Sequence, residues 1–466
     1  MEDQLLKDLG FTGAIFTPTS PAYGTANQRY SHNAILRPTY ILQPRDIPDL
    51  PRAIQFARSQ KLEIAVKGGG AFHYAAASSN GGVVIDLAKM DQVVVSEDKK
   101  SVSVGGGAKW GDVYAETDKH GVVPVGGDVH FVGVGGYTLG GGYSRMSGKY
   151  GLGIDNILKA TVVLADGKIV ETSEESEPDL FWAIRGGVNQ FGIVAELVLK
   201  LYPMPGPVTV GPVVFPGTQF KEVLAATHEH LENHDPSTKL ILMFARAPPD
   251  FHPAILILPY IENNSTPPDT VLAPFRELAR PVFEDIQTVD TFTAVSHAID
   301  KALEGAPPRV LMGGALFSAL WDDTFTETWV EWVKFTEQPE FRFSALLWEF
   351  GHPEKIAEKK VEDTAFAARD PHYYFVVCPR YAEASDDQKA AEWASKLSSR
   401  VSQAQVEKTG KKLPTPASFA LSPEAVSVED MYGENLPRLR QLKAKYDPEK
   451  VWNRGWVIEP GEHFGF

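Results

Sequence analysis

The sequence predicts an α+β fold, and three observations lead to this prediction. The first 204 residues hold most of the glycines, several short apolar runs and an amphipathic helix pattern at 47–61. A Pro/Gly-rich break, "MPGPVTVGP" at 204–212, precedes apolar runs that alternate with longer helical stretches. The chain then ends with a helix pattern at 432–447 and a tail. We therefore expect three parts: residues 1–204, 205–417 and 418–466.

The first part begins with a strand–helix–strand pattern. The strand-like run "LEIAVK" (62–67) follows the predicted helix, which indicates a βαβ-like start. Further on, "KATVVLADGKIVET" (159–172) joins two β-branched runs through Asp166 and Gly167, and this predicts a hairpin.

The second part carries strand-like runs such as "SALLWEFGH" (344–352) and "HYYFVVCPRY" (372–381). Helix patterns at 217–232 and 322–336 lie between such runs. This alternation predicts an antiparallel sheet backed by helices.

Composition limits the class of protein. The formal net charge of −15 over 466 residues argues against nucleic acid and anionic membranes as partners. The single cysteine, Cys378, cannot form an intramolecular disulfide, and the first residues lack an apolar signal core. We expect a cytoplasmic monomer or simple homo-oligomer that acts on a small molecule. Secretion stays open if a signal peptide was removed.

Four glycine clusters dominate the first part, at 68–70, 105–111, 133–143 and 148–153. Glycines let successive backbone N–H groups point into a concavity, which suits a pyrophosphate. The alternative is a set of tight turns, but four clusters in one part favour ligand binding. Neither standard phosphate motif is present, because Thr138 stands where G-x-G-x-x-G needs its third glycine.

Several blocks of sequence together resemble one family. They include "RDIPDLPRAIQFARSQKLEIAVKGGG", "VGVGGYTLGGGYSRMSGKYGLGIDNI", "PDLFWAIRGGVNQFGIVAELVLKLYP" and "YGENLPRLRQLKAKYDPEKVWNRGWVIEP". The chain resembles the berberine-bridge-enzyme-like FAD-linked oxidases of the vanillyl-alcohol oxidase / p-cresol methylhydroxylase superfamily. The resemblance implies an FAD-binding domain of the p-cresol-methylhydroxylase type, made of two α/β subdomains over residues 1–204. It implies a substrate-binding domain over 205–417 and a C-terminal segment that returns to the FAD-binding domain.

The resemblance also implies which positions contact FAD. They form a pyrophosphate loop, a lining for the flavin and its phosphates, an adenine end and a tail that reaches back to the cofactor. In this chain they are Lys67, Gly68, Gly69, Gly70, Ala71, Val132, Gly133, Gly136, Gly141, Gly142, Tyr143, Gly192, Val194, Trp452 and Asn453.

Two positions depart from the family. Most members link the flavin to a histidine at the position of Ala71, and many also link it to a cysteine at the position of Val129. The direct inference is non-covalent FAD. His73 is an alternative anchor, because in an extended strand it would lie on the same face as Ala71. His130 is a second alternative, and whether Ala71 is natural or engineered stays open.

Catalysis in such an enzyme needs a base that takes the substrate proton while a hydride passes to flavin N5. Glu349 is our first candidate, since its neighbours Trp348 and Phe350 point to the other face of the strand. The alternative is a strand charge that faces water. Further candidates are Tyr143, Tyr374 and Arg380.

The function that follows is an FAD-dependent oxidase of a secondary-metabolite intermediate or a sugar or other alcohol. In the family, a valine at the position of Val132 goes with reoxidation by O2, which gives H2O2. The alternative functions are a redox-silent cyclase or isomerase that retains the flavoprotein fold, and a cofactor-free binding protein. We expect no metal site, because "HEHLENH" (228–234) has the pattern of a solvated helix face.

Overall fold

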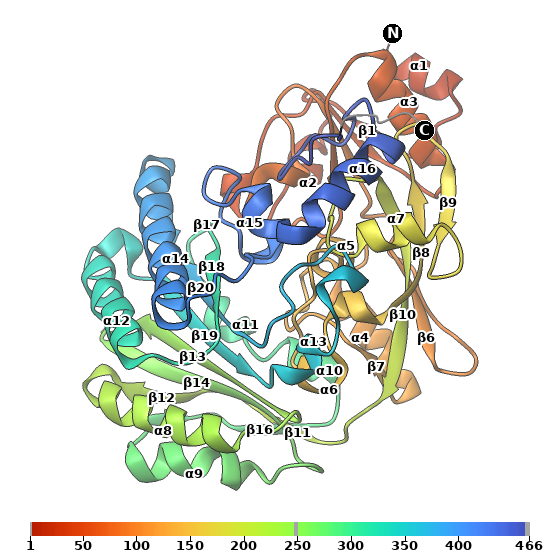
Figure 1. The fold of residues 1–466 in the computed structure, drawn as a ribbon. Coiled ribbons are helices and arrows are strands. Elements are labelled where there is room, and N and C mark those ends of the chain that lie inside the picture. The colour runs from red at the N-terminus through yellow and green to blue at the C-terminus, as the bar shows by residue number, and fades with distance from the viewer. Residues whose placement is uncertain (1, 247–249, 462–466) are drawn as a thin grey trace.

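The computed structural model describes residues 2–246 and 250–461 and contains three main sheets (Figure 1). Two smaller sheets form the first part of the chain, and a nine-stranded sheet forms the second. The blue C-terminal helices lie back against the first part in Figure 1. The fold is α+β, as the sequence predicted.

The first sheet has the strand order β1-β2-β4-β3. Strands β2 and β3 both pair with β4 in parallel, and helix α3 connects them, so the predicted βαβ-like start is confirmed. Helix α3 buries Leu50, Ile54 and Phe56 at helical spacing against this sheet. The elements are β1 (Ala14–Phe16), β2 (Tyr40–Gln43), α3 (Asp49–Ser59), β3 (Ile64–Lys67) and β4 (Val83–Asp86).

The second sheet is antiparallel, with the order β5-β6-β10-β8-β9 and with β7 paired to β10. Strands β8 and β9 form the predicted hairpin, and Gly167 in its turn has a φ of +86°. The strands are β5 (Val93–Val95), β6 (Ser101–Gly105), β7 (Val122–Pro124), β8 (Ile157–Val163), β9 (Ile169–Thr172) and β10 (Ile193–Pro203).

The third sheet is the predicted antiparallel sheet backed by helices. Its main order is β15-β12-β14-β13-β19-β20-β18; β11 also pairs with β14, and β16 pairs with β11. Four helices pack their apolar sides on one face: α8 (Phe220–Asn233), α9 (Pro268–Leu278), α12 (Asp322–Thr336) and α14 (Asp387–Thr409). The strands that matter below are β13 (Thr238–Arg246), β14 (Pro253–Glu262), β18 (Gly313–Phe317), β19 (Ala345–Gly351) and β20 (Tyr373–Cys378).

The other face of this sheet turns toward the glycine-rich part. Tyr374 and Val376 of β20 share one apolar core with α4 (Trp110–Thr117), α5 (Val134–Leu139) and α7 (Pro178–Ile184). Alternate residues of β20, Phe375 and Val377, lie in the helix-covered core instead. Side chains of the inner face therefore meet the glycine clusters of the first part.

The C-terminal segment is fastened to the first part by a buried ion pair. Lys443, on α16 (Leu436–Tyr446), lies 2.7 Å from Asp447, and both side chains are fully buried. The Lys443 ammonium also donates to the carbonyl oxygens of Gln190 and Trp452, each at 2.8 Å. This contact brings the tail back to the first part, while the three domain boundaries given above remain our proposal.

No helix among residues 2–246 and 250–461 is long and apolar enough to cross a membrane.

Candidate active site

The loop after β3 presents a run of free backbone donors. The amides of Gly68 through His73 donate to no other group within the described chain. Gly70 has a φ of +71°, a left-handed conformation that glycine adopts without strain. Consecutive unpaired N–H groups in such a turn form a concave anion site. The sequence prediction of a phosphate-binding loop at 68–70 therefore has the necessary donors.

This loop touches the glycine cluster at 133–143 through a contact between two glycines. A Cβ atom on Gly69 would lie 2.4 Å from the Cα of Gly133, and a Cβ on Gly133 would lie 2.4 Å from the Gly69 nitrogen. Real Cβ atoms do not approach other atoms that closely, so both positions need glycine for the two loops to meet. Gly136, one turn into α5, is exposed with open space where a Cβ would be.

A second run of free amides lies just before this contact. The N–H groups of Gly126, Gly127, Asp128 and Val129 find no acceptor in the part of the chain that the structure describes. The same turn places the Asp128 side chain toward the inner face of the large sheet, where it receives a hydrogen bond from Lys239 at 3.0 Å. The sequence analysis did not identify residues 126–128 as part of the site.

Lys239 on β13 is the centre of a buried polar cluster. Its ammonium lies 3.0 Å from the Asp128 carboxylate, 2.8 Å from the Glu349 carboxylate and 2.7 Å from the Tyr374 hydroxyl. The Tyr374 hydroxyl in turn donates to Glu349. Burial alone would lower the Lys239 pKa, but the carboxylates of Asp128 and Glu349 raise it above its ordinary value.

Glu349 is 9% exposed, so the alternative of a strand charge that faces water is wrong. Trp348 and Phe350 lie in the helix-covered core, as the strand alternation predicted. Glu349 therefore belongs to the inner face, together with Tyr374, whose pKa is raised well above 10 by burial and by the nearby carboxylate of Glu349.

Tyr143 packs on Tyr374 with ring centroids 4.8 Å apart, and its hydroxyl lies 2.7 Å from Nε2 of His372. Nδ1 of His372 lies 2.6 Å from the carbonyl oxygen of Asp370, so Nδ1 carries the proton. Burial lowers the His372 pKa to about 4, and the neutral ring can only accept at Nε2. The Tyr143 hydroxyl is therefore a donor to His372.

Asp128 and Lys239 were missed by the sequence analysis, although each left a signal. Lys239 is the one charged residue of the buried stretch 238–242 on β13, and Asp128 interrupts an apolar turn after two glycines. A charge in an apolar strand needs a buried partner. The sequence contained no indication of which partner that is, because the two residues are far apart in the chain.

The two proposed histidine anchors both have other neighbours. His73 is 1% exposed and its Nε2 lies 3.2 Å from the carbonyl oxygen of Leu421, while burial lowers its pKa to about 4. The prediction that His73 lies on the same face as Ala71 assumed an extended strand. This assumption is wrong, because β3 ends at Lys67 and residues 71–74 belong to no strand. His130 faces Asp300 at 3.1 Å.

Three of the remaining predicted cofactor positions are glycines packed against protein atoms. Cβ atoms on Gly141, Gly142 and Gly192 would lie within 3 Å of Phe366, Gly153 and Val162, so packing alone requires glycine there. Lys67 pairs with Asp86 at 3.1 Å. Val194 and Trp452 are buried and Asn453 is exposed, and their contact with a cofactor stays a prediction.

The histidines of "HEHLENH" lie on two sides of α8. His228 is exposed and lies 2.6 Å from Asp322, but His230 is 4% exposed. The predicted solvated face is therefore wrong for His230, which belongs to the inward stripe of α8 with Ala226 and Thr227. His234 follows on the same side, with its ring centroid 5.9 Å from that of His230.

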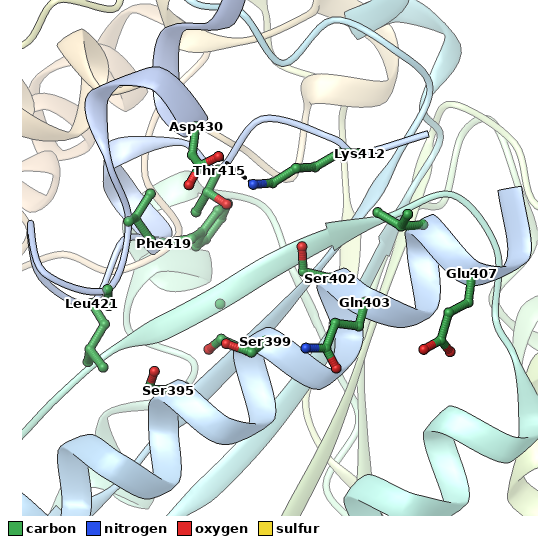
Figure 2. A pocket seen from close by; sticks show the side chains of 15 residues that line it. Ser395, Ser399, Ser402, Gln403, Glu407, Lys412, Thr415, Phe419, Leu421 and Asp430 are labelled. Carbon is green, nitrogen blue, oxygen red and sulfur yellow. Dashed lines mark hydrogen bonds and ion pairs between the residues drawn. The ribbon is translucent and has the colours of Figure 1, made fainter. Parts of the chain in front are cut away.

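A cavity of about 480 Å³ lies between α14 and the segment 412–430, and none of its lining residues belongs to the four glycine clusters. Figure 2 shows Ser395, Ser399 and Ser402 of α14 on one side and the Lys412–Asp430 ion pair on the other. Phe419 lines this cavity and stacks on Tyr374 with ring centroids 4.9 Å apart. Phe419 therefore lies between the cavity and the polar cluster.

The residues present fit FAD by the chemistry of their donors. Two runs of unpaired amides, at 68–73 and 126–129, offer N–H groups to a pyrophosphate and to a flavin ring. Gly69 and Gly133 hold the loops together, and the open space at Gly136 leaves room for a ligand beside α5.

Known proteins match both ends of the chain. Residues 38–173 match the family described as FAD binding domain, and residues 419–454 match the family described as Berberine and berberine like. FAD-linked oxidoreductase pgmH from Aspergillus terreus is 27% identical over 468 residues, which cover 94% of this chain and 91% of that relative. (R)-6-hydroxynicotine oxidase from Paenarthrobacter nicotinovorans is 32% identical over 211 residues, which cover 45% of this chain and 46% of that enzyme.

Solved structures show the same fold. 6-Hydroxy-D-nicotine oxidase from Arthrobacter nicotinovorans superposes with a TM-score of 0.83 at 23% identity, covering 97% of this chain and 99% of that one. Xylooligosaccharide oxidase from Myceliophthora thermophila C1 also gives 0.83 at 23% identity, covering 99% of each chain.

Proposed function

Because the chain belongs to the berberine-like FAD-linked oxidoreductases, we propose that it is an oxidase of a small organic alcohol, hemiacetal or amine. The observation that carries this proposal is the buried group of Lys239, Glu349 and Tyr374, which the Lys239–Asp128 ion pair joins to the 126–129 turn. Alcohol or amine oxidation needs a proton acceptor on the chain, and this group contains one.

The three side chains divide the proton chemistry among them. Tyr374 donates its hydroxyl hydrogen to Glu349 and accepts from Lys239, so it can take a substrate proton while it passes its own to the carboxylate. The Lys239 ammonium balances the negative charge of Glu349. Tyr143, fixed as a donor to His372, packs against the ring of Tyr374 and holds it in place.

FAD, when bound, would supply the redox chemistry, as the acceptor of a hydride from the substrate and the donor of two electrons to O2, which with two protons would give H2O2. We propose O2 as the acceptor on the family resemblance at Val132.

We propose further that FAD is bound without a covalent bond. Ala71 carries no nucleophile, and the chain's single cysteine, Cys378, lies on β20 rather than at position 129. His73 and His130 are engaged by Leu421 and Asp300. The amide cradle at 68–73 supports binding by hydrogen bonds alone.

For the substrate we favour a secondary-metabolite intermediate over a sugar. Covalent attachment raises the oxidising power of a flavin, and this chain lacks both family anchors. Amines and sugars should also be tested as substrates, because two similar proteins are named as oxidases of 6-hydroxynicotine and of xylooligosaccharides.

The experiment measures the turnover of three probe substrates by the FAD-loaded protein: xylobiose, (R)-6-hydroxynicotine and benzyl alcohol. Turnover should consume O2 in air and bleach the flavin without air. Glu349→Gln should lower kcat by about 10²–10⁴-fold and leave FAD binding unchanged. Glu383→Gln, which changes an exposed carboxylate, should have the wild-type kcat. Full kcat in Glu349→Gln would refute the assigned base. Turnover without bleaching or O2 uptake would instead favour the redox-silent cyclase or isomerase.

A further inference from the structure

Two histidines and an aspartate meet at a surface site that the oxidase chemistry does not use. His130 comes from the turn before α5, His297 follows α10 (Phe292–Ser296), and Asp300 is the first residue of α11 (Asp300–Leu303). Nε2 of His130 lies 3.1 Å from Oδ1 of Asp300, and Nδ1 of His297 lies 2.5 Å from Oδ2 of the same carboxylate. One ligand atom from each residue lies within 4.8 Å of the other two.

The three side chains have the composition of a transition-metal site. Zinc is held in proteins by histidine nitrogens and carboxylate oxygens, and three protein ligands with a water complete a tetrahedron. The side chains are 31%, 45% and 38% exposed, so a water or a small anion can reach the fourth position. Oδ1 of Asp300 is itself buried and accepts no hydrogen bond of good geometry from any described residue.

We propose that His130, His297 and Asp300 bind one divalent ion of the zinc class, and that this ion joins the first and second parts of the chain. The rings of His130 and His297 stack with centroids 4.0 Å apart and planes 18° apart. Nearly parallel rings do not aim their nitrogens at one point. Binding therefore requires the more exposed ring, His297, to tilt so that both nitrogens converge beside Asp300.

The surrounding contacts make this tilt local, because the backbone around the site is already fixed. Asp118 accepts hydrogen bonds from the amides of Phe292 and Thr293 at 3.1 and 2.9 Å, which anchors the start of α10 on the first part. The amide of His130 donates to the carbonyl oxygen of Ser296 at 3.2 Å, which anchors its end. Only side chains have to move.

The ion would act on structure and not on the oxidation step. His130 directly follows the turn 126–129, whose amides donate to no described residue. A bond from this residue to the second part would hold that turn against the large sheet. Metal binding stabilises the folded chain by mass action, because the unfolded chain does not bring the three ligands together.

The experiment uses the untagged, FAD-loaded full chain after removal of metals with EDTA. We expect one Zn²⁺ per chain to remain after dialysis against Zn²⁺ and gel filtration, and the thermal midpoint to rise with the Zn²⁺ concentration. Co²⁺ in place of Zn²⁺ should give the visible absorption of a four-coordinate ion.

The variants are His297→Ala and Asp300→Ala, with His228→Ala as the matched control. His228 forms an exposed pair with Asp322 at 2.6 Å, so it has the same surface chemistry without a third ligand. Each of the two site variants should weaken Zn²⁺ binding by at least about tenfold. Even the mutation of a residue that only hydrogen-bonds to a metal ligand lowers metal affinity by about that factor. Their metal-free melting curves, compared with that of wild type, separate loss of a ligand from loss of the fold.

Three results would overturn the proposal: the wild-type chain retains no Zn²⁺, His228→Ala loses as much Zn²⁺ affinity as the site variants, or both site variants bind Zn²⁺ as tightly as wild type.

Discussion

Replacement of Lys239 by methionine tests the buried polar cluster most severely. The Lys239 side chain is 3% exposed and neutralises two carboxylates, those of Asp128 and Glu349, at 3.0 and 2.8 Å. Methionine fills a similar volume without charge, so Lys239→Met removes the one cation that pairs with Glu349 among the described residues. Asp128 keeps Arg145, whose Nε lies 3.6 Å from its carboxylate. Removing one partner of a buried ion pair costs about 3–5 kcal/mol, and we expect this loss in the free energy of unfolding at pH 8.

The pH dependence of the variant gives a second, independent signature. A buried carboxylate that has lost its cation takes up a proton more readily in the folded state than in the unfolded state. The folded variant then binds more protons than the unfolded chain, so its stability falls as pH rises. The deficit relative to wild type should be smaller at pH 5 than at pH 8.

The assay is urea unfolding of the FAD-loaded protein at both pH values, with Lys239→Met/Glu349→Gln as the matched variant. The double variant removes the carboxylate that Lys239→Met leaves without a cation, and it should recover part of the loss at pH 8. A deficit below about 1 kcal/mol in Lys239→Met, with no recovery in the double variant, would refute the assigned charges of the cluster.

Three further predictions concern single positions. Gly69→Ala should lower the affinity for FAD in a fluorescence titration, because its Cβ would lie 2.4 Å from a backbone atom of the facing loop. Gly24→Ala, where a Cβ has open space, should bind FAD with the wild-type affinity. Burial lowers the His230 pKa to about 4, so only the unfolded chain takes up the proton between about pH 6.5 and 4. As the pH falls from about 6.5 to 4, this residue should therefore lower the free energy of unfolding by about 3 kcal/mol. His230→Gln should flatten the curve of unfolding free energy against pH, and His228→Gln should leave the curve unchanged. Ala71→His should place flavin in the acid-precipitated pellet, and an unchanged yellow supernatant would argue against the alignment of this loop with the family.

The elements of the fold could be predicted because local patterns determine them. The helix α3, the hairpin of β8 and β9 and the strand β19 all follow from apolar periodicity and turn residues. The predicted hairpin turn at Gly167 lies where a positive φ is needed. Such features depend on neighbours in the sequence and need no knowledge of distant contacts.

The polar cluster could not be predicted in full because it is assembled from distant segments. Glu349 and Tyr374 were candidates from strand alternation. Lys239 joins them through the pairing of β13 with β19, and Asp128 joins them through the packing of the large sheet on the 126–129 turn. His230 was misplaced for the same reason, since a histidine on an amphipathic helix can face either water or core. Side-chain chemistry was visible in the sequence, and the partners were not.

Acid precipitation of the purified protein tests most directly the claim that the amide cradle holds FAD without a covalent bond. We predict a yellow protein that releases one FAD per chain into the supernatant and leaves a colourless pellet. A yellow pellet would contradict non-covalent binding and point to a side chain such as His73 or His130. A colourless protein that does not bind added FAD would contradict the cofactor site itself.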